Sequence, residues 1–541
     1  MLSTVILLPL ALALLVVTPA LAGIGRRLAP LAALPALIAG LAGPGPADQP
    51  WILLGLELKL DTLGRALLLL TGTVWTLAAW QASQSIKEGK NRFWFFWLVT
   101  LAGTGLVFSA GDAAGFYAGY VTMTLAAYGL VVHAATPEAI RAGRVYLVLA
   151  LAGEALILGG LLQLAATHGN ANLAELPGLL AEAPLHASAG WLMLAGFAVK
   201  MGLAPLHVWL PLAHPVAPVP ASAILSGILV KAGLLGWLRL VPPVSLSQIP
   251  DPGLLVCGVG LATSVLAALA GLTQLRPKVV LAYSTISQMG LIAAAFGLAL
   301  AGAATASLFP LFGLLVLHHG INKAALFLAA GSPGDDRRLW LAGLAALSLA
   351  GLPLTSGFLA KYGLKELAEL RADWIGAAVT ATSLTTTLIL THLLVRMKSE
   401  SGDGQARTHP ALPLLVALGL ALPWVWVATH GLPAGLTWSG IRDGLWPLLA
   451  GLALAWAASR IGVSLPRLPE GDLVVAGERM AAGAAAWLRN VLENVPAIQG
   501  PGLSFNPERR VEALEAWLSG MPRVGLVLLG LAATLWWLLV E

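Results

Sequence analysis

The chain has 541 residues, of which 58% are hydrophobic and only 11% are charged, and its formal net charge is +5. A soluble protein of this size would carry about 25% charged residues, and many apolar runs exceed the ~18 residues that a helix needs to cross a bilayer. These numbers exclude an ordinary soluble protein, and continuous apolar runs disfavour a transmembrane β-barrel. We expect an all-α polytopic membrane protein, because helices satisfy their own backbone hydrogen bonds in lipid.

About sixteen apolar runs are candidate membrane spans. In chain order they cover residues 2–22, 28–45, 61–83, 93–110, 113–133, 145–166, 189–211, 221–240, 254–273, 279–300, 307–330, 339–362, 374–396, 411–430, 444–460 and 523–540. Most lysines and arginines of the connecting loops fall on alternate loops, with Arg371 and Arg442 as exceptions. Since positive loops stay on the cytoplasmic side, we expect the N-terminus outside the membrane.

The positive charge thus predicts topology rather than a nucleic-acid partner. The single cysteine, Cys257, has no second cysteine to pair with, and the sequence contains no Cys/His cluster for zinc or iron–sulfur. Dinucleotide and phosphate-loop motifs and a nucleophile–base constellation are also missing from the sequence. We therefore expect no cofactor, metal or catalytic site in this chain, so any redox chemistry would belong to another subunit.

Several ionisable side chains stand inside apolar runs, where such groups are rare. They are Glu154, Lys200, Lys231 and Lys361, joined by His207, His214, His318, His319 and Lys323. A lone lysine can extend its ammonium to the interface, which would suit Lys323 but not Lys200, and a lone glutamate can form a packing salt bridge. A row of groups that each gain and lose a proton, linked by water, is what a proton path requires.

Helix breakers accompany two of these lysines. Gly202 and Pro205 follow Lys200 in "AGFAVKMGLAPLHVWLPLAHP", and Pro353 and Gly357 precede Lys361 in "AGLPLTSGFLAKYGLKEL". A proline inside a helix frees a carbonyl group that must be solvated or paired. Interrupted helices near the midplane form the ion sites of transporters built from inverted repeats. The interrupted spans are the seventh and twelfth, and this odd offset suggests two five-span units of opposite orientation.

The predicted organisation follows from these units. Residues 1–92 hold spans 1–3, 93–240 the first repeat (spans 4–8), 254–396 the second repeat (spans 9–13), 411–460 spans 14 and 15, 468–519 an amphipathic segment, and 523–541 span 16. We expect the segment 468–519 to lie at the cytoplasmic interface. The alternative is that it docks onto or braces neighbouring subunits.

Four sequence blocks resemble one family of membrane subunits. They are "KMGLAPLHVWLPLAHPVAPVPASAILSGILVKAGLLGWLR" (200–239), "KVVLAYSTISQMG" (278–290), "HHGINKAALFLAAGS" (318–332) and "GLPLTSGFLAKYGLKE" (351–366). In this order they resemble the antiporter-like subunits of respiratory complex I, Mrp-type multisubunit Na⁺/H⁺ antiporters and membrane-bound hydrogenases. The resemblance implies fourteen core helices with two inverted five-helix repeats and broken helices 7 and 12. It also implies proton movement, alone or in exchange for sodium, along a hydrated central axis.

The resemblance assigns roles to individual residues. Lys200 would be the central lysine of the first half-channel, Lys231 the connecting lysine, His319 and Lys323 the central relay, and Lys361 the terminal lysine of the second half. It further implies other membrane subunits as partners, redox subunits in the case of a redox-driven pump, and a multi-pass location in the bacterial inner membrane. We expect His207, His214 and His318 to be accessory groups.

Two features depart from the family pattern. Val121, in "GYVTMTLAAYGLV", occupies the position where relatives usually carry a glutamate that pairs with the lysine of span 7. Glu154 lies at a similar depth on the neighbouring span, so we expect it to pair with Lys200 instead. The connection "PGDDRRLWLAGLAALS" before span 12 is also shorter than is common in the family, which would change a loop or a partner contact there.

Three functions remain open from the sequence. The first is a proton-translocating subunit of an Mrp-type antiporter or of a complex I-like or hydrogenase-like pump. The second is the membrane subunit of an inorganic-carbon uptake complex, which Lys231 argues against. The third is a scaffold that has lost transport, which the row of buried ionisable residues disfavours.

Overall fold

The computed structural model describes residues 2–42, 47–49, 56–168, 184–241, 251–302, 308–331, 336–369, 371–400, 408–462 and 465–475, with the isolated positions 477, 478, 480, 483 and 486. The chain divides into two compact units, Met1–Val475 and Ala476–Glu541. Every named helix and strand belongs to the first unit. The predicted span 16 in 523–541 and most of the amphipathic segment 468–519 lie outside the described residues.

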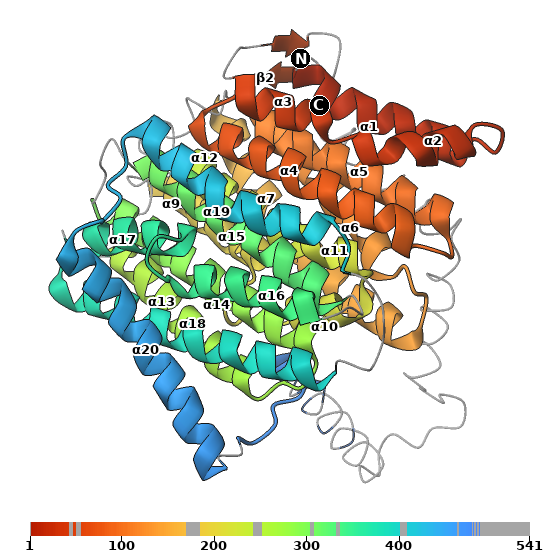
Figure 1. The fold of residues 1–541 in the computed structure, drawn as a ribbon. Helices are drawn as coiled ribbons and strands as arrows, with labels where there is room; N and C mark the ends of the chain where they lie inside the picture. The colour runs from red at the N-terminus through yellow and green to blue at the C-terminus, as the bar shows by residue number, and fades with distance from the viewer. Residues whose placement is uncertain are drawn as a thin grey trace, which may run out of the picture. The chain divides into compact units, whose positions relative to one another are not determined.

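The first half of the chain is helical apart from one small hairpin (Figure 1). Its elements are α1 (Leu2–Val17), α2 (Ala22–Leu28), the 3₁₀ turn η1 (Ala29–Leu31), α3 (Leu34–Ala42), β1 (Ala47–Gln49), β2 (Leu56–Leu58), α4 (Thr62–Ser85), α5 (Lys90–Ser109), α6 (Ala113–Val131), α7 (Pro137–His168), α9 (Pro184–Met201), α10 (Trp209–Val216), α11 (Val219–Ile224), the π-helical turn η2 (Leu225–Leu229) and α12 (Lys231–Leu240). Strands β1 and β2 pair antiparallel, with Asp48 opposite Glu57. This two-stranded sheet is an addition to the all-α prediction.

The second half consists of helices in the described residues. They are α13 (Pro252–Leu272), α14 (Pro277–Leu300), α15 (Leu308–Ala330), α16 (Asp336–Ala350), α17 (Ser356–Glu369), α18 (Asp373–Ser399), α19 (Ala411–His430) and α20 (Trp438–Ile461). Carboxylates begin several helices of the chain: Asp61, Asp112 and Asp251 each accept a hydrogen bond from the backbone amide three residues later. Such N-caps satisfy amides that a helix leaves unpaired.

Eleven helices in the described part of the chain are long and apolar enough to cross a membrane, and Leu2–Val17 and Ser188–Met201 are shorter apolar helices. The chain is therefore a multi-pass helical membrane protein, as its composition predicts. The total of sixteen spans stays a prediction, because interrupted spans consist of short pieces and span 16 is not described.

The seventh and twelfth spans are interrupted, as expected. Residues 202–208 separate α9 from α10, and residues 351–355 separate α16 from α17. Pro205 and Pro353 both lie in these interruptions, and Gly202 has φ +70°, a conformation that glycine adopts without strain. Gly357 instead lies in the first turn of α17, where an added Cβ would stand 1.7 Å from the Ser348 carbonyl oxygen. Its role is therefore to let α17 approach α16 rather than to break the helix.

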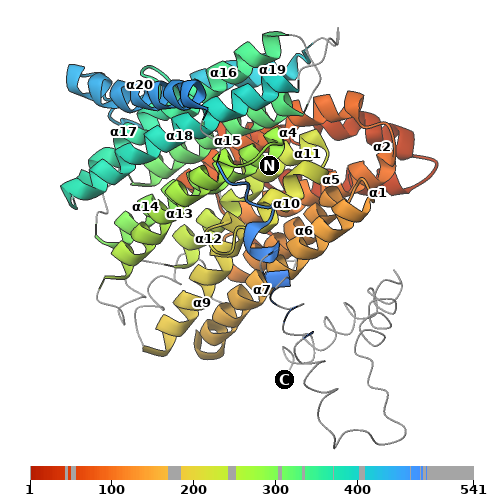
Figure 2. The ribbon, with the colours of Figure 1, turned by 90° about the horizontal axis from the view of Figure 1, so that it is seen from below.

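Helix α15 lies in the middle of the first unit (Figure 2). It packs against α4, α11, α14, α16, α17 and α19. The apolar stretch that would cross the membrane is 100% buried in α14 and in α15, whereas in α20 only 17% of it is buried. Side chains on α15 are consequently shielded from both lipid and bulk water, and this helix carries His318, His319 and Lys323.

Ion pairs join loops that the predicted alternation assigns to the same face. Arg239 binds Asp61 at 2.9 Å, Arg371 binds Asp251 at 2.6 Å, and Arg276 binds Glu138 at 2.9 Å. Arg371 and Arg442, the two exceptions to the alternation of positive loops, both contact carboxylates. Arg371 contacts Asp251, and Arg442 contacts Asp443 at 3.3 Å. These pairs support the alternation of the spans. The side on which the N-terminus lies stays a prediction.

Arg239 connects three segments at one end of the first unit: its own helix α12, the end of α5 and the start of α4. Its guanidinium donates to the carbonyl oxygens of Val107, Phe108 and Ala110, which end α5, and to Asp61, which caps α4. Its side chain is only 8% exposed. Partial burial raises the pKa of Asp61, but the charge and hydrogen bond of Arg239 outweigh it and hold this pKa below the ordinary carboxyl value.

We predict that Arg239→Ala lowers the stability of the protein. The substitution leaves helix-end carbonyls without a donor, which corresponds to a loss of about 2–3 kcal/mol for hydrogen bonds to a charged group. The midpoint of thermal unfolding in detergent should fall. The matched control is Arg27→Ala, because Arg27 is exposed. Equal midpoints for the two variants would contradict the prediction.

Candidate functional site

The predicted ionisable residues are buried inside the helices of the first unit. Lys231 and Lys323 are 0% exposed, and the remaining members of the set are at most 8% exposed, namely Glu154, Lys200, His207, His214, His318, His319 and Lys361. Lys323 therefore does not extend to the surface of the chain, which removes the interfacial alternative for this residue. Buried charges of this kind are costly unless polar groups surround them.

Glu154 and Lys200 lie near each other with Thr124 between them. The Lys200 ammonium donates to the Thr124 hydroxyl at 2.8 Å, and the same hydroxyl donates to the Tyr120 carbonyl at 2.8 Å. The Glu154 carboxylate interacts electrostatically with Lys200 and lies beside Thr124, while its Oε1 has no hydrogen-bond partner among the described residues. The expected pair is thus adjacent, with α6 supplying a hydroxyl one turn away from Tyr120.

Aromatic side chains enclose Lys200. Its Nζ stands 5.5 Å from the ring centre of Tyr120 and 5.7 Å from that of Tyr146, distances suited to cation–π attraction. A small cavity beside it is lined by Tyr120, Thr124, Tyr146, Lys200 and Trp209, among others, and has room for about one water molecule. The Val199 carbonyl near the end of α9 accepts from the Trp209 indole at 2.9 Å and from the Gly202 amide at 3.1 Å, so it is already paired.

The π-helical turn η2 places Lys231. Residues Leu225–Leu229 widen the helix immediately before this lysine, and Lys231 Nζ donates to the Ser226 carbonyl at 2.5 Å. Such a turn shifts the backbone hydrogen-bond pattern and often marks a functional site. The Ser226 hydroxyl meets Thr285 of α14 at 2.8 Å, which fixes the turn against the neighbouring helix.

Lys231 belongs to a group of cations and histidines on α12, α15 and α17. His319 lies in electrostatic range of Lys231, Lys323 and His318, and His318 lies in range of both Lys231 and Lys361. His318 Nδ1 meets the Ser356 hydroxyl at 2.9 Å, at the start of α17. Neither ring nitrogen of His319 has a hydrogen-bond partner among the described residues. Buried polar atoms of this kind are normally satisfied by water.

Lys361 lies at the interruption of the twelfth span. Its ammonium donates to the Ala350 carbonyl at 2.9 Å, the last residue of α16. A cavity with room for a few water molecules connects Lys361 with Thr380 and Ser383 of α18 and with Lys365 and Asp443. Lys365 binds Asp443 of α20 at 2.6 Å. The second interruption is thus hydratable and ends beside an ion pair.

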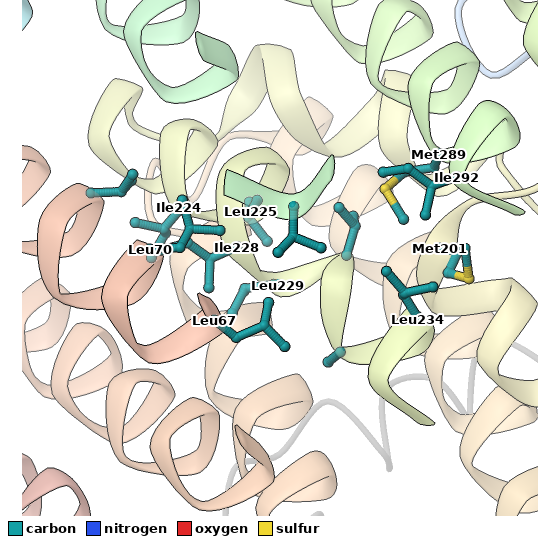
Figure 3. Close-up of a cluster of buried hydrophobic side chains, with 14 of the residues drawn as sticks. Leu67, Leu70, Met201, Ile224, Leu225, Ile228, Leu229, Leu234, Met289 and Ile292 are labelled. Carbon is teal, nitrogen blue, oxygen red and sulfur yellow. The ribbon is translucent and has the colours of Figure 1, made fainter. Parts of the chain in front are cut away.

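The Lys200 group and the Lys231 group are not joined by a direct polar contact in the described residues. Met201 follows Lys200, Leu234 lies one turn beyond Lys231, and both belong with Met289 to a cluster of buried hydrophobic side chains (Figure 3). This arrangement brings Lys231, His318, His319, Lys323 and Lys361 together but keeps Glu154 and Lys200 apart from them.

His207 lies in the first interruption and His214 follows it on α10, and the two have different surroundings. His214 is stacked on Phe327 at 4.5 Å between ring centres. His207 Nε2 contacts Asp472 at 3.0 Å, a carboxylate that also accepts from the Tyr283 hydroxyl at 3.2 Å. Burial raises the pKa of Asp472, but hydrogen bonds from His207, the Leu473 amide and Tyr283 outweigh it and hold this pKa below the ordinary value.

Sequence reasoning missed several polar groups that contact the predicted residues. Thr124, Ser226, Asp443 and Asp472 are the clearest cases. Thr124 lies three residues after Val121, in a stretch where the family pattern directs attention to a carboxylate rather than to a hydroxyl. Asp443 could have been flagged as an acidic residue at the start of an apolar run. Across the part of the chain that is described, no group of three or more His, Cys, Asp or Glu side chains could hold a metal ion.

Comparison with known proteins gives sequence relatives in two functional settings. Hydrogenase-4 component B of Escherichia coli (strain K12) is 36% identical over 192 residues, which cover 34% of this chain and 28% of that protein. A Na(+)/H(+) antiporter subunit of Alkalihalophilus pseudofirmus is 28% identical over 357 residues, 60% of this chain and 69% of that protein. The matched region thus spans less than a third of the length of hydrogenase-4 component B.

Solved structures share the fold. The Mrp complex from Dietzia sp. DQ12-45-1b contains a chain with a TM-score of 0.72 and 22% identity, covering 97% of this chain and 62% of that one. The membrane-bound sulfane sulfur reductase (MBS), an archaeal respiratory membrane complex, gives a TM-score of 0.68 at 22% identity, covering 84% of this chain and 99% of its own.

Residues 110–339 also match the family described as NADH:quinone oxidoreductase/Mrp antiporter, TM. This range includes Glu154, Lys200 and Lys231 and three of the four sequence blocks, and the helical fold agrees with that of the solved Mrp complex. The match of residues 110–339 to the NADH:quinone oxidoreductase/Mrp antiporter transmembrane family agrees with the resemblance that the sequence blocks predict.

Proposed function

We propose that the chain conducts protons across the membrane as one subunit of a larger membrane complex. The observation that carries the proposal is the burial of Lys200, Lys231, Lys323 and Lys361 at no more than 8% exposure in a helical membrane protein. Four buried ammonium groups are not explained by packing alone, because each is costly to dehydrate. A series of lysines that take up and release a proton one after another would explain why these side chains are buried.

The first half of the proposed path begins at Glu154 and Lys200. An opposite charge favours the protonated lysine, whereas burial disfavours it. Because Thr124 stands between the two groups, a small shift of the Glu154 carboxylate changes how tightly Lys200 holds its proton. Glu154 thereby takes the role of the glutamate that is replaced by Val121.

The second half runs from Lys231 through His319, His318 and Lys323 to Lys361. Transfer between Lys200 and Lys231 requires water to pass the apolar side chains around Met201 and Leu234, so this step is the barrier along the path. The ring nitrogens of His319, which have no hydrogen-bond partner among the described residues, provide places where such water would be held. The cavity at Lys361 would release the proton toward Lys365 and Asp443.

The setting of the chain is part of the proposal. We infer that it lies in the bacterial inner membrane with its N-terminus outside, that it assembles with other membrane subunits, and that redox subunits join it where the complex is a pump. The two inverted repeats, spans 4–8 and 9–13, would give the two halves of the path. The coupled ion is H⁺, with Na⁺ as the alternative in an antiporter.

We predict that Lys200→Met and Lys361→Met each abolish proton transport. Methionine keeps the length and apolar stem of lysine but cannot bind a proton. The measurement is proton flux in inverted membrane vesicles from cells that express the complete complex. Lys398→Met is the matched control, because Lys398 is exposed at the end of α18. Normal flux in both buried variants would favour the scaffold alternative.

A second prediction concerns the carboxylate of the first half. Glu154→Gln should abolish flux, because the amide cannot change charge, and Glu154→Asp should retain part of it. Assembly of the complex serves as the control and should be the same for both variants. Flux in Glu154→Gln that equals that of the unaltered protein would reject the pairing with Lys200.

A third prediction isolates Thr124. Thr124→Val preserves the shape of the side chain but leaves the Lys200 ammonium without its 2.8 Å acceptor. We expect flux to fall by roughly tenfold, in line with a lost hydrogen bond to a charged group. Thr71→Val is the control, because the Thr71 hydroxyl is also buried but bonds only to its own helix at Leu67. A similar decrease in both variants would show that the loss is not specific to the Lys200 site.

A further inference from the structure

Residues 465–475, here termed the strap, follow α20 and return across one face of the first unit. The Leu468 amide and carbonyl bond to Thr273 and Gln274 at 3.4 and 3.1 Å, just after α13. Arg276 then binds Glu470 and, at 2.9 Å, Glu138 at the start of α7. The strap is therefore attached at several points to the segments where α14 and α7 begin.

The strap ends on a carboxylate placed against the first interrupted helix. Asp472 contacts His207 Nε2 at 3.0 Å and Tyr283 at 3.2 Å, and the Leu473 amide donates to its second oxygen at 2.5 Å. Its side chain is 17% exposed, against 9% for His207. The Asp472 carboxylate is thus more exposed than the imidazole that it contacts. This order is expected where a carboxylate takes a proton from solvent and passes it to a more buried group.

The other ring nitrogen of this imidazole is buried. His207 Nδ1 has no hydrogen-bond partner among the described residues. His207 lies in the same interruption that begins after Met201, and Trp209, two residues on, lines the cavity beside Lys200. One ring nitrogen therefore faces Asp472 while the other is available to water in the interruption next to Lys200.

We propose that Asp472 and His207 form the proton-uptake site of the first half of the path, with the strap supplying the carboxylate. This inference rests on the proposed function. Asp472 takes a proton from water and passes it to His207 Nε2; the imidazolium then releases its Nδ1 proton to water in the interruption, and Lys200 accepts it. A rotation of the ring then turns the free Nδ1 toward Asp472 and the Nε2–H toward the interruption, which resets the relay, so that one proton leaves the aqueous phase for each proton delivered to Lys200.

The site lies on the face that carries the positive loops. Arg276 and Lys278 precede or begin α14, and Arg141 and Arg144 lie near the start of α7. By the distribution of positive charge this is the cytoplasmic face. Glu470 is the other acidic residue of the strap, and Arg276 neutralises it. Asp472 therefore has no competing free carboxylate on the described strap.

The test compares Asp472→Asn with Glu470→Gln in vesicles containing the complete complex. Asparagine keeps the size of the side chain but cannot carry a proton, so flux from the cytoplasmic face should fall by roughly tenfold or more. Glu470→Gln removes the bond of the strap to Arg276 and should leave most of the flux. Asp472→Glu should restore transport because it keeps a carboxylate that can carry a proton, whereas a merely structural contact fitted to the length of aspartate would not recover.

Thermal unfolding of each variant separates loss of the site from loss of the fold. If Asp472→Asn fails to assemble, His207→Gln provides the same test without altering the strap and should show the same loss of flux. Full flux in Asp472→Asn or His207→Gln, while Lys200→Met is inactive, would overturn the uptake site and leave the proposed function intact. Full flux in Lys200→Met would overturn the proposed function itself.

Discussion

The arrangement of this protein depends on hydrogen bonds from buried lysines to backbone carbonyls at the ends or irregularities of helices. Lys361 donates to Ala350 at the end of α16 and Lys231 to Ser226 in the π-helical turn, and the half-buried Lys278 donates to Ala217 just after α10. A regular helix pairs its carbonyls internally, so they offer a buried ammonium only a longer, second contact, such as the 3.4 Å bond from Lys323 to the Leu281 carbonyl of α14. Interrupting the helix provides an acceptor at membrane depth, and the same interruption leaves space for water.

Lys200 uses a side-chain acceptor instead, and this difference has a physical cause. The carbonyl of Val199, beside the interruption, already accepts from the indole of Trp209 and from the Gly202 amide. The ammonium therefore uses the hydroxyl of Thr124, with Glu154 nearby. A side-chain acceptor can rotate and a carboxylate can move, whereas a backbone carbonyl is fixed. The first half of the proposed path is thus the more adjustable one, which suits the place where proton affinity would be switched.

Sequence patterns predicted the parts of the fold that depend on local chemistry. Apolar runs indicated the membrane helices, and the glycines and prolines around Lys200 and Lys361 indicated the two interruptions. The same patterns indicated Glu154 as the neighbour of Lys200, because two adjacent spans of known direction fix the relative depth of their residues. They could not predict η2, since the single glycine of "LSGIL", Gly227, does not distinguish a π-helical turn from a regular one. They also could not predict Asp472, because its contacts with His207 and Tyr283 join positions 265 and 189 residues apart.

The missed carboxylates share a position in the chain that explains why they matter. Asp443 on α20 and Asp472 on the strap both follow residue 339, where the family match ends. Asp443 binds Lys365 in the cavity that reaches Lys361, and Asp472 binds His207 at the first interruption. The C-terminal part of the chain therefore brings an acidic group to each end of the proposed path. Carboxylates at the two ends of the path do not contact the central lysines, so they can differ without disturbing them. The part of the chain after residue 339, which supplies Asp443 and Asp472, can therefore adjust proton uptake and release while the fold around the central lysines stays unaltered.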